Sequence, residues 1–460
     1  MQKTVKLKCG LDIAMTGAAA QEIGSINRPE VYNIVPDHFA GVTPRLDVHE
    51  GDKVKAGSPL FHDKQFVQMM FTSPVSGTVK AIVRGERRKI MSIQIEADKQ
   101  IDYLSFETAN LNGMSGEDIK DVLLKSGLWC LLKQRPYDCI AFPDRQPKAV
   151  FVSTFDSAPL APDYEFIVKG HTTELQAGIT ALAKAAGVPI NIGVKHGAAA
   201  TDFRGLKDVV VTEFQGPHPA GNVGVQINHV NPVNKGETVW TVNIQDVLLI
   251  GRLFTKGIVD MQKLVALTGT IAAEPKYYRV LPGMPLSAIF RSNVVRGIPA
   301  RYIAGNVLSG HQVDIEEFVS LYDNQYTVID DGSQTNEFMG WAMPRFNKFS
   351  AGRMFFTKYF NSCFRRSWFG KKEFEFDARL LGGRRAIIVS GEYDKVFPMD
   401  IYPEFLIKAM IAGNLDKMEQ LGAYEVAPED FALAEFVCTS KMPLQAIVRA
   451  ALDNMRKELE

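Results

Sequence analysis

Two short motifs decide the fold of the N-terminal part: V-H-E-G-D-K-V-K-A-G-S-P-L (Val48 to Leu60) and T-S-P-V-S-G-T-V-K-A-I (Thr72 to Ile82). The Gly-Asp pair of the first motif predicts a tight turn, and Pro74 and Gly77 shape a second turn before another strand. Around them, residues 31 to 96 form short alternating apolar runs that Gly, Pro and Asp interrupt. This pattern is typical of β-strands, so we expect an all-β unit.

The two motifs, in this order, resemble the half-motifs of biotinyl/lipoyl barrel-sandwich domains. A carrier domain of that kind presents a modifiable lysine at the tip of the hairpin between the halves. Lys64 lies in that hairpin, but ten residues before Pro74 and without a methionine beside it. We therefore predict that residues 1–100 hold an N-terminal segment and a barrel-sandwich domain that keeps the shape without the carrier chemistry.

Helix signals appear from about residue 115. Ser115 to Gly127 combines a serine N-cap, acidic residues in the first turn and a closing glycine. The elements expected after it are the strand Ala149 to Ser153, the helix Thr172 to Ala186 ending at Gly187, and the strands Pro189 to Val194 and Asp208 to Phe214. Strand–helix–strand alternation predicts a parallel sheet, so we assign residues 101–257 to a Rossmann-like α/β domain.

The rest of the chain divides into three parts. Val265 to Phe290 predicts a strand, a turn, a second strand and a helix, an order that resembles the SLBB β-grasp module, assigned here to residues 258–330. Residues 331–380 are rich in Phe, Arg and Gly and predict an irregular linker. Residues 381–460 predict a helical module with amphipathic helices at Pro403 to Ala412 and Leu444 to Leu459. The expected fold class is multidomain α/β.

Charge and length exclude some functions. The 460 residues are too many for one core, so several domains are expected. Lysine plus arginine equals aspartate plus glutamate at 52 each, so no global field draws the chain to nucleic acid or anionic lipid. A local basic stretch, R-G-E-R-R-K (Arg84 to Lys89), is most simply a solvated turn.

The five cysteines are scattered, and none forms a C-x-x-C pair, so neither a disulfide framework nor a cysteine metal site is expected. They are Cys9, Cys130, Cys139, Cys363 and Cys438. Met1 to Gly10 lacks the apolar stretch of a secretory signal, and no run of about 18 apolar residues predicts a spanning helix. We expect a cytoplasmic location, with partners supplying any attachment to a membrane.

The domain order resembles that of the flavin subunit of respiratory complex I and the C subunit of the Rnf complex. In those proteins a Gly-rich loop holds the phosphate of a flavin, because only glycines let backbone amides approach an anion closely. The corresponding stretch here, Ser126 to Pro143, has the single glycine Gly127 followed by bulky Leu and Trp. The acidic stretch that helps build the flavin site has become Ser153 to Leu160, with the one acid Asp156. Flavin and NADH binding are therefore predicted to be lost.

The helical module of those relatives carries iron–sulfur clusters on cysteines at fixed spacing. The ligand positions map here onto Cys438, Ala434, Phe431 and Pro428, and onto Phe397, Tyr393 and Ser390. Only one of them is a cysteine, so the resemblance implies vestigial positions without a cluster.

This pattern, a redox architecture without its ligands, is similar to the A subunits of the Na+-translocating NADH:quinone oxidoreductases (Na+-NQR). Local features along nearly the whole chain carry the resemblance. They are K-C-G-L-D-I (Lys8 to Ile13), G-V-T-P-R (Gly41 to Arg45), G-L-W-x-x-x-x-R-P (Gly127 to Pro136), G-P-H-P-A-G (Gly216 to Gly221) and E-F-V-C-T-S-K (Glu435 to Lys441). One departure is Thr439, where many relatives have proline.

The resemblance implies membership in a complex that passes electrons from NADH to ubiquinone or menaquinone and exports Na+. The FMN, FAD, riboflavin and iron–sulfur centre would lie in the other subunits, and this chain would bind no cofactor of its own. It would be seated on the B subunit, which lies in the membrane, at the cytoplasmic face of the bacterial inner membrane. The isolated chain would not be catalytic.

A quinone needs an apolar slot, aromatic stacking and donors to its carbonyl oxygens. One candidate segment offers Trp129, Arg135 and Tyr137, and a second offers Phe39 and Val42. The resemblance implies that quinone is associated with this N-terminal half. The alternative is that these residues pack domains or face the membrane partner, which would make the chain a structural scaffold.

Two further alternatives remain open. His218, between two prolines, could form a metal site or a proton relay with Asn228 and His229, although a rigid structural loop is the simpler interpretation. The chain could also be an active diaphorase like the complex I flavin subunit.

Overall fold

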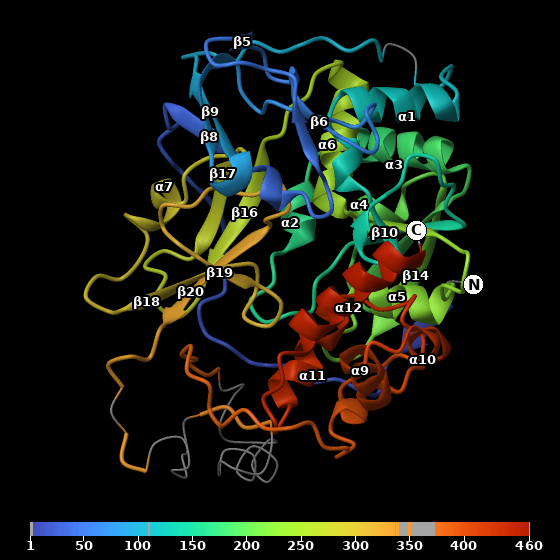
Figure 1. The fold of residues 1–460 in the computed structure, drawn as a ribbon, viewed down its shortest axis with the longest axis vertical. Helices are drawn as coiled ribbons and strands as arrows, with labels where there is room; N and C mark the ends of the chain where they lie inside the picture. The colour runs from blue at the N-terminus through green and yellow to red at the C-terminus, as the bar shows by residue number, and fades with distance from the viewer. Residues whose placement is uncertain (1–2, 109–110, 336, 340–347, 352–372, 460) are drawn as a thin grey trace.

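The computed structural model describes residues 3–108, 111–335, 337–339, 348–351 and 373–459. Most of the expected irregular linker, with Cys363, lies outside these residues. The described chain forms four β-sheets and a group of C-terminal helices (Figure 1).

Residues 31 to 96 fold into two small antiparallel sheets, which confirms the all-β prediction. The four-stranded sheet has the order β3 (Val31–Ile34), β9 (Ile90–Ala97), β8 (Gly77–Arg84), β5 (Lys53–Val54). The three-stranded sheet has the order β4 (Pro44–Leu46), β6 (Pro59–Asp63), β7 (Met70–Thr72). Two short 3₁₀ helices accompany them, η1 (Pro36–His38) and η2 (Glu86–Arg88). Phe61 and Phe71 stack at a centroid distance of 4.6 Å in the core, and Lys64 is exposed after β6.

The first strands of the chain lie outside these two sheets, which the sequence did not indicate. Strand β1 (Lys3–Lys6) pairs in parallel with a strand of the α/β sheet, and β2 (Ala20–Gly24) pairs in parallel with a strand of the third domain. The N-terminal segment therefore joins two sheets that lie hundreds of residues further along the chain.

The central sheet has the strand order β1-β14-β13-β12-β15-β10-β11, and its core strands are parallel as predicted. The strands are β10 (Lys133–Arg135), β11 (Cys139–Ile140), β12 (Ala149–Ser153), β13 (Ile190–Lys195), β14 (Val209–Gln215) and β15 (Val239–Asn243). The helices are α1 (Gly116–Lys125), α2 (Tyr164–Val168), α3 (Thr172–Ala186), α4 (Thr201–Arg204), α5 (Val223–Val230) and α6 (Ile244–Lys256). The predicted Ser115 cap forms a capping box, and α3 ends at Gly187 with a φ of +68°.

Alternating residues of β12 separate two hydrophobic cores. Val150 and Val152 belong to the core that contains residues of α1, α3 and α6. Ala149 and Phe151 belong to a second core, built with α5 and the C-terminal helices. Because successive strand residues point to opposite faces, one sheet organises both cores.

The third domain is a sheet of order β19-β18-β20-β16-β17-β2. Its elements are β16 (Lys263–Thr268), β17 (Lys276–Val280), α7 (Ser287–Phe290), β18 (Ala300–Ala304), β19 (His311–Val313) and β20 (Gln325–Asp330). The predicted order of two strands and a helix within Val265 to Phe290 is confirmed.

The C-terminal module is helical, as predicted, and lies beside α5 (Figure 1). Its elements are η5 (Tyr393–Lys395), α9 (Pro403–Ile411), α10 (Leu415–Gln420), η6 (Pro428–Phe431), α11 (Ala432–Val437) and α12 (Leu444–Leu459). Helices α9 and α12 match the two predicted helices, whereas α10 and α11 were not predicted. Within the described chain, no helix combines the length and the apolar character needed to cross a membrane.

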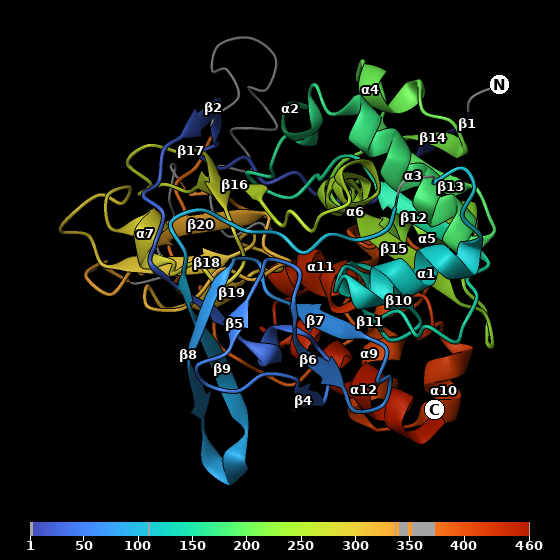
Figure 2. The same ribbon diagram turned by 90° about the horizontal axis from the view of Figure 1, so that it is seen from above.

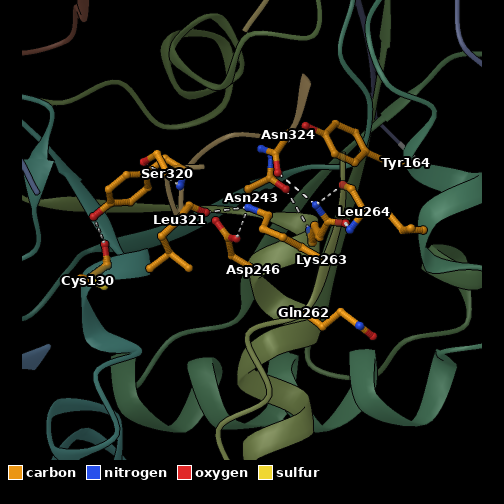
Figure 3. A network of polar contacts seen from close by, with 12 residues as sticks. Cys130, Tyr164, Asn243, Asp246, Gln262, Lys263, Leu264, Ser320, Leu321 and Asn324 are labelled. Atoms are coloured by element: carbon orange, nitrogen blue, oxygen red, sulfur yellow. Dashed lines mark hydrogen bonds and ion pairs between the residues drawn. The ribbon is translucent and has the colours of Figure 1, made fainter. Parts of the chain in front are cut away.

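A buried polar network joins α6 to the third domain (Figure 3). The Lys263 ammonium lies 3.4 Å from the Asp246 carboxylate and donates to the Leu321 carbonyl at 2.7 Å, and both charged residues are buried. Burial raises the pKa of Asp246, and the Lys263 charge opposes that rise. Next to this pair, Gln245 exchanges hydrogen bonds with the backbone of Leu264. The start of α6 is therefore fixed to the first residues of β16.

We predict that Asp246→Ala lowers the free energy of unfolding by about 3–5 kcal/mol, because the Lys263 charge would stay buried without its carboxylate. The double variant Asp246→Leu/Lys263→Met removes both charges and should be markedly more stable than the single variant. Urea unfolding of the three proteins measures both effects. A single variant as stable as the double variant would contradict this account of the junction.

Candidate functional site

A cavity of about 250 Å³ is lined by residues of one segment predicted to contact quinone and by residues that directly follow the other. Ala40 and Gly41 come from the loop after η1, Asp138 comes from the turn between β10 and β11, and Cys139 is the first residue of β11. The remaining lining residues all belong to α12, and they are Arg449, Asp453, Arg456 and Lys457. The barrel, the α/β domain and the C-terminal module therefore all border this cavity.

The cavity is lined by charged groups on its helical side. The Arg456 guanidinium lies so close to Gly41 that a Cβ atom on this glycine would be 2.5 Å from Nη1. Burial raises the pKa of the Cys139 thiol to about 11, although Arg456 beside it acts in the opposite direction. A protonated, buried thiol is a poor nucleophile, so Cys139 contributes packing and not reactivity.

The β10–β11 turn that borders the cavity has an unusual backbone. The Arg135–Pro136 peptide bond is cis, and Tyr137 and Asp138 have φ values of 77° and 50°. Such φ values persist in non-glycine residues only where surrounding contacts impose them. Arg449 supplies these contacts, because its guanidinium donates to the carbonyl oxygens of both Tyr137 and Asp138.

Arg135 is buried and forms the centre of a cluster of charges. Its Nη1 lies 3.2 Å from the Asp138 carboxylate, and its Nη2 donates to Glu429 at 3.1 Å and lies 4.0 Å from Asp430. Burial alone would raise the pKa of Asp138, but the charges of Arg135, Lys133 and Arg449 together outweigh burial and lower that pKa. The arginine thus joins the β10–β11 turn to η6, and its charge is neutralised within the protein.

Asp430 is the most deeply buried carboxylate of this cluster. Its Oδ2 accepts from the Ala427 amide at 2.8 Å, whereas its buried Oδ1 has no hydrogen-bond partner. Gly224, in the first turn of α5, allows this approach, since a Cβ there would lie 2.5 Å from both carboxylate oxygens. Burial raises the pKa of Asp430 to about 7, and the Arg135 charge opposes part of that rise.

None of the five residues predicted to contact quinone lines the cavity. Trp129 is fully buried, donates from Nε1 to the Ala141 carbonyl at 2.7 Å and meets Trp240 edge to face. Tyr137 is buried in the second core, and the Arg135 guanidinium forms ion pairs with Asp138 and Glu429. Phe39 packs against other aromatic rings of the barrel, and Val42 is half-buried beside the first core. Their role in quinone binding stays a prediction.

The carboxyl ends of the parallel strands, where such sheets commonly bind ligands, are filled by the chain itself. The order of strands reverses between β12 and β15. Ser153, at the end of β12, donates to the carbonyl oxygens of Phe155 and Gly221 and accepts from Gln226. Asn243, at the end of β15, accepts from the Gln245 amide and donates to the Tyr164 hydroxyl.

The stretch Ser126 to Pro143 also differs from a phosphate-binding loop. A Cβ on Gly127 would lie 2.6 Å from the Thr72 hydroxyl, so this glycine serves close packing against the barrel. The residues after it are buried and form the 3₁₀ helix η3 (Trp129–Leu131). The backbone here faces protein and not an open anion site.

His218 occupies a rigid loop. Its Nδ1 lies 3.0 Å from the Ser157 hydroxyl, its amide donates to Asp12, and burial lowers its pKa. His229 instead contacts the Val225 carbonyl, and Asn228 donates to Glu425. No three His, Cys, Asp or Glu side chains gather in metal-binding geometry among the residues the structure describes.

The positions predicted to correspond to cluster ligands lie close together and carry packed side chains. The rings of Phe397 and Phe431 pack at a centroid distance of 4.9 Å, and the Tyr393 hydroxyl lies 2.9 Å from the Cys438 thiol. Ala434 is buried with them, and Pro428 is half-buried at the start of η6. Ser390, the remaining position, is exposed and donates from its amide to Glu404.

Three family models match the chain. They describe an NqrA N-terminal barrel-sandwich hybrid domain (residues 5–98), an NqrA second alpha/beta domain (residues 114–259) and an NQRA C-terminal domain (residues 264–314). The A subunit of the Na(+)-translocating NADH-quinone reductase of Haemophilus influenzae (strain PittEE) is 35% identical over 458 residues, covering 99% of this chain and all of the relative. The chain belongs to the NqrA family. The corresponding NqrA relative from Pasteurella multocida (strain Pm70) is likewise 35% identical over 457 residues.

Among solved structures, an NAD+-reducing [NiFe]-hydrogenase matches at 12% sequence identity and a TM-score of 0.37. The match covers 75% of this NqrA-family chain and 69% of the hydrogenase chain. That score is too low to show a shared fold.

Sequence reasoning missed the charged residues of this NqrA-family site. Glu429 lies 294 positions from Arg135, and Arg449 and Arg456 stand on a helix with an ordinary charged face. The one available signal was that two acids follow Pro428 at the start of a turn. Nothing in that spacing indicates the partner, since the contact depends on how the C-terminal module packs on the sheet.

We expect the free energy of unfolding of the wild type to fall as the pH rises from 5 to 8, partly because of Asp430. We predict that this fall is smaller in Asp430→Asn by on the order of 2 kcal/mol. The folded protein keeps this proton up to about pH 7, whereas an unfolded aspartate releases it near pH 4. Raising the pH between these values therefore favours unfolding of the wild type. Thermal unfolding across this pH range measures the difference, with exposed Asp416→Asn as control. Parallel pH profiles for wild type and Asp430→Asn would refute it.

Proposed function

We propose that the chain is the cofactor-free A subunit of a Na+-pumping NADH:quinone oxidoreductase. In this role it contributes to the reduction of ubiquinone or menaquinone to quinol, coupled to Na+ export. The observation that carries the proposal is the end-to-end match, at 35% identity, to a relative named as the A subunit of the Na(+)-translocating NADH-quinone reductase. The named activity belongs to a multi-subunit enzyme, so this chain acts within an assembly.

The finer architecture belongs to the same proposal. We assign residues 1–100 to the N-terminal segment and barrel-sandwich, 101–257 to a Rossmann-like domain, 258–330 to an SLBB β-grasp domain and 381–460 to a cluster-less ferredoxin-like module, with a linker between the last two. The parallel core β14-β13-β12-β15 supports the second assignment, and the helices η5 to α12 are compatible with the last.

In this proposal, side chains of the chain itself occupy the space that a cofactor would need. An iron–sulfur cluster needs thiolate ligands, and the vestigial positions offer one cysteine among packed aromatic and small side chains. The residues present therefore do not fit a cluster. Gly127, packed on the barrel, does not fit a flavin phosphate. We therefore place FMN, FAD, riboflavin and the iron–sulfur centre in the partner proteins of the complex.

We place the chain on the B subunit in the membrane, at the cytoplasmic face of the bacterial inner membrane. The composition of the chain offers no long apolar segment for insertion, so attachment through a partner accounts for a membrane enzyme subunit of this kind.

The cavity beside Gly41 is our candidate for a quinone contact. Its volume of about 250 Å³ suits a head group, and its lining includes Ala40 and Gly41 of the second predicted segment and Asp138 and Cys139, which follow the first. Arg449 and Arg456 place positive charge where a quinone carbonyl would gain electron density on reduction. Trp129, Arg135, Tyr137, Phe39 and Val42 do not line this cavity, so in this proposal they act by positioning the neighbouring residues that do.

One observation favours the alternative, a structural scaffold without quinone contact. Trp129, Arg135 and Tyr137 are buried, Trp129 donates to the Ala141 carbonyl, and the Arg135 guanidinium forms ion pairs with Asp138 and Glu429. Residues of that kind stabilise an interface between domains whether or not a ligand binds nearby.

The variant Arg456→Gln distinguishes a quinone contact from a purely structural role. It is tested in the complex purified through a tag on this chain. We predict that the other subunits co-purify, and that the variant raises the KM for quinone about tenfold, the size of one charge-assisted contact. NADH oxidation by an artificial electron acceptor should stay unchanged, since that reaction bypasses quinone.

The matched control is Arg384→Gln, which changes an exposed arginine of the same module. It should change neither the KM for quinone nor NADH oxidation by the artificial electron acceptor. An unchanged quinone KM in Arg456→Gln supports the scaffold instead. A tagged chain that retains no other subunit refutes the membership itself.

A further inference from the structure

The hairpin of β8 and β9 extends beyond the barrel that carries it. Strand β3 pairs only with residues 93–96 of β9, and β5 pairs only with residues 77–78 of β8. Among the described strands, the outer part of the hairpin, from residue 81 to residue 92, thus pairs only with itself. Figure 2 shows it projecting away from the rest of the molecule.

The tip of this hairpin concentrates positive charge in a chain that is neutral overall. Residues 83 to 89 are all exposed, and they include Arg84, Arg87, Arg88 and Lys89 with the single acid Glu86. Lys89 forms an ion pair with Asp37 of η1, which leaves three arginines against one glutamate. Arg84 donates to the Arg88 carbonyl at 3.2 Å, so the turn holds these side chains together.

Apolar side chains flank the arginines on both strands. Val83 is 39% exposed and Met91 is 42% exposed, and Met91 folds over the backbone of Gly85. A guanidinium binds phosphate oxygens well, and neighbouring apolar side chains enter the boundary between head groups and acyl chains. A projecting tip with both properties matches the surface of an anionic lipid bilayer.

We propose that this hairpin tip, residues 83–91, docks on the phosphate head groups of an anionic membrane surface. A flat bilayer is accessible to a single projecting point, whereas nucleic acid binding needs a wider basic face than one hairpin tip provides. The tip thus gives a membrane enzyme subunit its own lipid contact, separate from its contact with a membrane partner. The proposal does not depend on quinone binding at Gly41.

Vesicle flotation of the full-length chain tests the proposal. We expect binding to mixed phosphatidylcholine–phosphatidylglycerol vesicles at low salt, and none to phosphatidylcholine alone. The variant R84Q/R87N/R88N should bind about 100-fold more weakly, since each basic residue contributes about fivefold near an anionic surface. Asparagine suits positions 87 and 88, where φ is positive, so the turn should be retained.

The matched control, K169Q/K195Q/K207Q, removes the same charge from exposed positions of the α/β domain and should bind like the wild type. A second variant, V83S/M91S, keeps the charge and should lose the part of binding that survives high salt. The proposal is overturned if the wild type does not prefer anionic vesicles, if the control weakens as much as the tip variant, or if the tip variant binds normally. Loss of other subunits from the tip variant with unchanged vesicle binding would assign the hairpin to a protein partner.

Discussion

The packing of Phe397 against Phe431 is the contact on which the rest of this account depends. Protein interiors are close-packed, so one buried volume is filled either by side chains or by a prosthetic group. In the C-terminal module these two rings, with Tyr393 and Cys438, occupy the former cluster positions. The module therefore has an ordinary hydrophobic core, and that core packs on the central sheet through Phe151.

Buried ionisable side chains also meet at the junctions between domains. The Asp430 carboxyl group lies against the first turn of α5, and Arg135, at the end of β10, lies 4.0 Å from it. The Lys263–Asp246 pair has the corresponding role between α6 and the third domain. Buried charges of this kind are costly when unpaired, so each pair favours one relative arrangement of the domains it joins.

Local elements were predictable because their signals are local. The Ser115 cap, the Gly187 stop and the strand β12 follow from residue preferences over a few positions. Strands β1 and β2 were not predictable, since each pairs with a strand more than two hundred residues away. The candidate site shows the same limit. The sequence indicated one segment that lines the cavity and another that ends directly before Asp138. It did not indicate which residues line the cavity, because bulky apolar residues such as Trp129 have the same pattern whether they contact a ligand or fill a core.

The proposed role requires a folded protein with no room and no ligands for a redox centre. Iron analysis and the visible absorption spectrum of the purified full-length chain test this requirement together. We predict a colourless protein with neither iron nor flavin above trace level. A yellow or brown protein with stoichiometric flavin or iron would contradict the account, because it would require Phe397 and Phe431 to separate or a site to form elsewhere.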